Sequence, residues 1–80
     1  MIITIRGDSI DITEIPLSHH IEWEFLLNEL NAEHIPGWYP DGKRMGVSVV
    51  DGKAHVFIYR TANMPPEAKT LEILGRYGIA

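Results

Sequence analysis

A β-hairpin is predicted over Met45–Tyr59, and it constrains the possible folds more than any other part of the chain. Asp51-Gly52 stands between two segments of alternating apolar residues, and this pair favours a type I′ turn because both central positions need φ > 0. A two-residue turn pairs Val50 with Lys53 and fixes the register of the whole hairpin. One face of the hairpin is then wholly apolar and is expected to be core; it consists of Met45, Val47, Val49, Ala54, Val56 and Ile58.

The opposite face of this hairpin is mixed and also holds large aromatic side chains. It consists of Arg44, Gly46, Ser48, Val50, Lys53, His55, Phe57 and Tyr59. A single sheet in a small domain needs only one buried face. Phe57 and Tyr59 are therefore either covered by a C-terminal helix or open to a partner.

The rest of the chain predicts another hairpin and two helices. Residues 1–15 alternate in the period of a strand, with turn residues at Gly7–Ser9. A helix is expected from His19 to about His34, with Ser18 as its N-cap. A second helix is expected from about Pro66 to Tyr77, with Gly78 as its C′ residue.

The predicted order is ββαββα, which indicates one α+β domain over residues 1–80. Two hairpins would form a four-stranded sheet, with the first helix packed on one face. The ββαββ part resembles the strand order of β-grasp (ubiquitin-like) folds. This resemblance is topological, rests on no motif and implies no activity.

Composition excludes several classes of protein. The 80 residues include no cysteine, which excludes a disulfide framework and a cysteine-ligated zinc site. The formal net charge of −4 argues against nonspecific nucleic-acid binding, because attraction to phosphates supplies most of such affinity. The N-terminus is too quickly polar for a secretory signal, and no apolar run could span a membrane. We expect a complete cytoplasmic protein that does not act at a membrane.

The first predicted helix has two apolar stripes at 100° per residue. The larger stripe is the better candidate for the core and consists of Trp23, Leu26, Leu27, Leu30 and His34. The second consists of Ile21, Phe25 and Ala32, next to an acidic ridge of Glu22, Glu29 and Glu33. The second stripe either packs under another element or forms an exposed patch rimmed by charge, as interaction sites do.

These patterns favour a non-enzymatic module that binds another protein. Trp38 and Tyr39 follow in a loop stiffened by prolines, and aromatic residues of this kind are enriched at interfaces. They either plug the end of the core or extend the contact surface. The predicted partner-binding residues are Ile21, Glu22, Phe25, Glu29, Glu33, Trp38 and Tyr39. A partner with a basic surface is expected, and a homodimer is possible. Small acidic cysteine-free chains of this kind are typical of phage or mobile-element accessory proteins, including inhibitors of host proteins.

The alternative function is single-stranded nucleic-acid binding by the mixed hairpin face. Phe57, Tyr59 and His55 would stack bases while Arg44 supplies charge. The strand Lys53–Tyr59 is similar to the strand motif of RNA-recognition folds but lacks their glycine and aromatic residue at the matching positions.

Catalytic and metal-binding signals are weak. The histidines are His19, His20, His34 and His55, and only His20 and Glu24 have a ligand-like i, i+4 spacing. A third ligand is not apparent, no serine stands in a nucleophile motif, and no glycine-rich phosphate loop occurs. We expect no catalysis, no metal and no cofactor.

Overall fold

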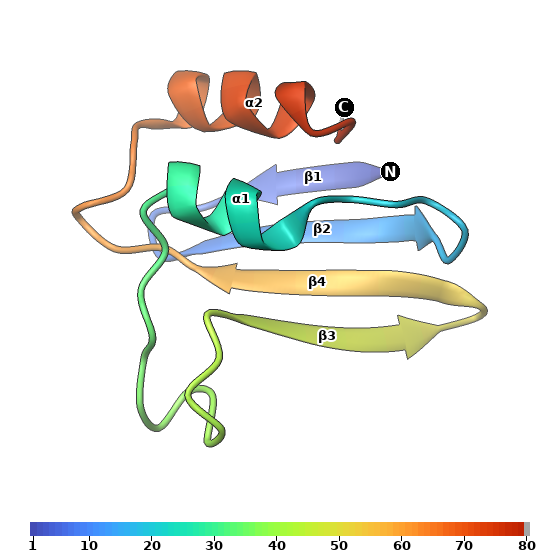
Figure 1. Ribbon diagram of the computed structural model, residues 1–80, viewed down its shortest axis with the longest axis horizontal. Helices are drawn as coiled ribbons and strands as arrows, with labels where there is room; N and C mark the ends of the chain where they lie inside the picture. The colour runs from blue at the N-terminus through green and yellow to red at the C-terminus, as the bar shows by residue number, and fades with distance from the viewer. Residues whose placement is uncertain (80) are drawn as a thin grey trace.

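The computed structural model describes residues 1–79 and has a four-stranded sheet with two helices (Figure 1). The predicted order ββαββα and the α+β class are confirmed. The elements are β1 (Ile2–Ile5), β2 (Ser9–Pro16), α1 (Trp23–Glu29), β3 (Met45–Val50), β4 (Lys53–Tyr59) and α2 (Glu67–Arg76).

The strands lie in the order β1-β2-β4-β3, and every neighbouring pair is antiparallel. The predicted register of the second hairpin is confirmed from Met45–Ile58 to Val50–Lys53. Asp51 and Gly52 close it with φ of 51° and 74°. A β-grasp sheet places its first strand centrally and parallel to its last, whereas β1 is here an edge strand. The resemblance to β-grasp folds is therefore limited to the order along the chain.

A bulge in β2 keeps three isoleucines on one face of the sheet. Pairing with β4 shifts between Ile12 and Ile15, and Glu14 at the bulge has φ of 57°. Strict alternation would direct Ile12 and Ile15 to opposite faces. An extra residue in a bulge restores the same face, so Ile10, Ile12 and Ile15 are all buried.

Helix α1 is shorter than the sequence predicts. The expected helix from His19 to His34 is wrong at both ends. At the N-terminus, His19 N–H donates a hydrogen bond to the Pro16 carbonyl in a turn after β2, so Ser18 lies in this turn and is not the N-cap of α1. At its C-terminus, Asn31 has φ of 57°, and a Schellman motif joins Ala32 N to the Leu27 carbonyl at 2.9 Å. Asparagine adopts this left-handed conformation more readily than most residues, which explains the early stop.

Because α1 is short, the second apolar stripe predicted for it does not form. Ile21 precedes α1 and Ala32 follows it, so neither has the helical phase that the wheel assumed, and both are buried. Phe25 lies inside α1 and is 62% exposed. The predicted exposed patch of Ile21 and Phe25 is wrong for Ile21, which is only 5% exposed.

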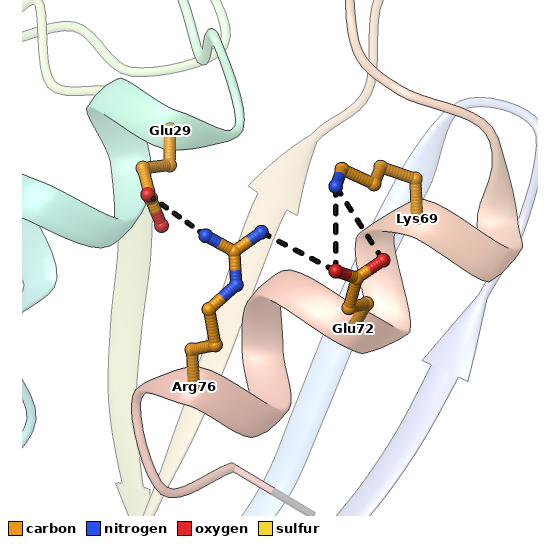
Figure 2. A network of polar contacts seen from close by, with 4 residues as sticks. All are labelled: Glu29, Lys69, Glu72 and Arg76. Atoms are coloured by element: carbon orange, nitrogen blue, oxygen red, sulfur yellow. Dashed lines mark hydrogen bonds and ion pairs between the residues drawn. The ribbon is translucent and has the colours of Figure 1, made fainter.

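Helix α2 ends with the same motif as α1 and is joined to it by an ion network. Ile79 N bonds to the Leu74 carbonyl at 3.0 Å, and Gly78 has φ of 80°, as the predicted C′ position requires. Figure 2 shows Arg76 between the two helices, with its guanidinium 3.2 Å from Glu29 and 3.8 Å from Glu72. Exposed ion pairs of this kind contribute little to the free energy of unfolding.

Both helices contribute to a core on one face of the sheet. Figure 1 shows them on the β1–β2 side, with β3 left uncovered. The buried apolar side chains are Ile10, Ile12, Ile15, Ile21, Leu26, Leu27, Leu30, Ala32, Val56, Ile58, Met64, Ile73, Leu74 and Ile79.

Candidate protein-binding site

Strand β3 is the part of the core face that the helices leave exposed. Val47 lies opposite the buried Val56, and Val49 lies opposite Ala54, yet these valines are 58% and 63% exposed. The prediction that the whole apolar face of the hairpin is core is therefore wrong at Val47 and Val49, whereas Met45 is partly buried and packs against the core. The helices cover β2 and β4 on this face and reach Met45 at the start of β3, but they leave Val47 and Val49 uncovered.

The outer edge of β3 has no neighbouring strand. Among the described residues, β3 pairs only with β4, and Met45–Val50 contains neither a charged residue nor a proline. Natural edge strands are usually blunted by lysine, proline, bulges or a covering element, because free N–H and C=O groups template pairing with another chain. A regular, uncharged edge is the usual recognition surface for an added strand.

An open groove of about 940 Å³ runs between α1 and the beginning of β3. Leu27, Met45 and Val47 give it an apolar lining, while Glu24, His34 and Arg44 are among its polar residues. An extended segment paired with β3 would have one row of side chains on this side of the sheet. The groove and the edge therefore form one surface, which we call the β3 surface and define by Leu27, Met45, Val47 and Val49.

Arg44 fixes the position of the loop that borders this groove. Its guanidinium donates to Asn28 Oδ1 at 2.7 Å and forms an ion pair with Glu24, both on α1. Its side chain is only 12% exposed. This linkage holds the beginning of β3 against the helix, so the groove is formed before any partner binds.

Two aromatic residues of the loop 35–44 cover part of the opposite face of the sheet. Trp38 stacks over this face with its ring centroid 5.2 Å from Tyr59 and 6.4 Å from Phe57. Tyr39 donates its hydroxyl to the Phe57 carbonyl at 3.0 Å. Gly46 leaves room for this ring, because a Cβ at that position would lie only 3.0 Å from the Tyr39 ring and would push against it. The expected alternatives, a covering C-terminal helix or an open aromatic face, are both replaced by this loop.

Burial raises the pKa of Tyr39, an effect that the backbone groups of Gly46 and Tyr59 partly oppose. The phenol therefore stays protonated and keeps its donor role well beyond neutral pH. Desolvation also raises the pKa of Tyr77, with a smaller contribution from the Glu29 carboxylate.

The predicted partner-binding residues do not form one continuous surface. Phe25 and Glu29 lie on α1, on the core side of the sheet, whereas Trp38 and Tyr39 pack on the other side. Glu29 pairs with Arg76.

The remaining acidic residues of the predicted ridge also have local partners. Glu22 Oε1 lies 3.0 Å from the His20 ring, and Glu33 Oε1 accepts a hydrogen bond from Asn63 at 2.9 Å. The ridge is thus partly occupied by contacts within the chain. Sequence reasoning missed Val47 and Val49, although the absence of charge in their strand was visible.

The nucleic-acid alternative loses most of its stacking surface in this structure. Trp38 overlies Phe57 and Tyr59, so bases cannot reach these rings without displacing it. Arg44 is engaged with α1, and His55 is half-buried. Trp38, 61% exposed, is the aromatic side chain left on the outside of this face.

Residues 1–79 contain no group of three histidine, aspartate or glutamate side chains placed to hold a metal ion. Within the same residues, no helix has the length and apolar character needed to cross a membrane. Comparison with protein-family models, curated proteins and solved structures gives no match.

Proposed function

We propose that this chain is a non-enzymatic protein-binding module, and that its partner binds as an extended strand paired with the free edge of β3. The observation that supports this most is an uncharged edge strand whose Val47 and Val49 are more than half exposed beside an open groove. Main-chain pairing supplies affinity in such complexes, and pockets for alternate side chains supply specificity.

The β3 surface defines the chemistry of the bound segment. Its alternate side chains would be apolar where they meet Val47 and Val49, because burial of these exposed apolar groups favours association. Basic residues at its ends or in the surrounding surface would suit a chain of net charge −4. A regulator or inhibitor role in the cytoplasm, such as that of a phage or mobile-element accessory protein, fits this mode of binding and forms part of the proposal.

The test starts from peptides selected on the immobilised protein from a displayed random library. Amide hydrogen exchange with and without a selected peptide should show new protection at Met45, Val47 and Val49. Val47→Lys should weaken peptide binding roughly tenfold or more, about 1.4 kcal/mol, because it puts a charge on the pairing edge.

Leu71→Lys is the matched control, since it places the same residue at an exposed apolar position on α2. It should leave peptide affinity unchanged. Protection that maps to Phe25 or Trp38, or binding that survives Val47→Lys, would refute strand addition at β3.

A further inference from the structure

We propose that β3 also pairs with β3 of a second copy, antiparallel about a two-fold axis at Val47. This inference rests on the proposed function and names one occupant of the same edge. Three features of β3 support this pairing: the direction of its backbone groups, the apolar match of its side chains and the charges that flank it.

The hairpin turn determines which backbone groups are free. In a two-residue turn the flanking residues Val50 and Lys53 form a hydrogen-bonded pair, and such pairs alternate along an antiparallel ladder. Gly46, Ser48 and Val50 thus direct their N–H and C=O groups toward β4. Met45, Val47 and Val49 direct theirs to the free edge.

A two-fold axis at Val47 uses all of these free groups. Val47 then pairs with Val47 of the second copy, and Met45 pairs with Val49 of the second copy in both directions. An axis at Ser48 would place Met45 against Asp51, which lies in the turn and outside the ladder. An axis at Val49 would leave Met45 without a partner, so the Val47 register satisfies the edge best.

Side chains also match in the Val47 register. Val47 and Val49, exposed in one copy, would meet Val47 and Met45 of the other copy on the same face of a continuous sheet. Apolar pairs directly across a ladder stabilise it, and the pairing also covers both free edges at once.

Charge complementarity supports the same register. Lys43 and Asp51 lie equally far from Val47 along the chain, so each faces the opposite charge of the second copy. Lys43 Nζ already lies 3.2 Å from Asp41, and both side chains are exposed and free to share a further partner. Figure 1 shows the loop before β3 reaching past the free edge, where the turn of the second copy would meet it.

Sedimentation equilibrium over roughly 1 to 500 µM tests the dimer, because a strand-pair interface of this size lies at the weak end of specific association. The parent protein should show a monomer–dimer equilibrium. Val47→Lys should abolish the dimer, while the Leu71→Lys control should leave it intact, and circular dichroism verifies the fold of each variant.

A charge test then fixes the register. Lys43→Glu opposes two carboxylates twice per dimer and should raise the dissociation constant roughly tenfold. Asp51→Asn in the Lys43→Glu background should recover most of this loss, since asparagine tolerates the positive φ at this turn. If Lys43→Glu has no effect, or if Asp51→Asn does not relieve it, the Val47 register is wrong.

The outcomes also separate this inference from the proposed function. A parent protein that remains monomeric over the whole range, yet binds selected peptides at β3, overturns the self-pairing and leaves the proposed function standing. A dimer in which selected peptides compete for the edge and yield monomers supports both.

Discussion

Strands β2 and β3 flank the same central strand and point apolar side chains to the same face, but only those of β2 are fully buried. One row across the sheet joins Ile12, Val56 and Val47, and the next joins Ile15, Ala54 and Val49. Ile12 and Ile15 on β2 are buried, whereas the valines on β3 are exposed. Alternation determines the face on which a side chain lies, but the position of the helices determines whether that face is covered.

The position of α1 explains much of this difference, because it lies over β2 and runs roughly along the strands rather than across them to β3 (Figure 1). The observed helix, Trp23–Glu29, extends about 10 Å, against about 24 Å for a helix from His19 to His34. The residues freed from the helix, among them Ile21 and Ala32, fill the core instead of forming a second stripe.

The difference between β2 and β3 is tested most directly by truncating equivalent side chains in one row of the sheet. Ile12→Ala should lower the free energy of unfolding by about 2–4 kcal/mol, because a fully buried isoleucine leaves a cavity. Val47→Ala should cost no more than about 0.5 kcal/mol in the monomer. Urea unfolding of dilute protein measures both, and equal losses would contradict the assigned exposure of β3.

A second variant tests how much the packing of the 35–44 loop on the sheet contributes to stability, compared with the packing of the helices on the other face. Trp38→Ala should destabilise the protein by about 1 kcal/mol, because it removes the stack on Phe57 and Tyr59 while Trp38 itself is largely exposed. Trp38→Phe keeps a ring in place and should retain most of the stability. Near-ultraviolet circular dichroism and urea unfolding report the change; an unaltered signal for Trp38→Ala would mean that the stack does not persist in solution.

The smallest expected effect is a dependence of loop stability on alkaline pH. The pKa of Tyr39 is raised in the folded state, so its contribution is fully present below the unfolded tyrosine value of about 10 and is lost as pH rises through the folded value. Tyr39→Phe should lose less stability than the parent protein between about pH 9 and pH 11. Tyr77 shifts in the same direction, so the comparison belongs in a Tyr77→Phe background. Parallel pH profiles with and without Tyr39 would contradict its protonated role.

Sequence patterns predicted the elements governed by local chemistry. Asp51-Gly52 determined the register of the second hairpin, and Gly78 marked the end of α2, because both positions require positive φ. Asn31 and Glu14 take similar conformations, but neither residue demands them, so the early end of α1 and the bulge in β2 were not predicted.

The candidate site was harder to predict because it depends on contacts between distant segments. The exposure of Val47 follows from where α1 packs, and the covering of Phe57 follows from the path of the 35–44 loop. Neither is encoded by periodicity. The uncharged sequence of β3 was the local signal available, and it has meaning only once β3 is known to be an edge strand.

The 35–44 loop joins the two sides of the molecule. It contributes Tyr39 to the groove beside β3 and places Trp38 on the aromatic rings behind the sheet. The chain has two tryptophans, so in a Trp23→Phe background Trp38 is the single intrinsic optical probe, and a segment that displaces this loop should change the emission of an indole on the far side without any added label.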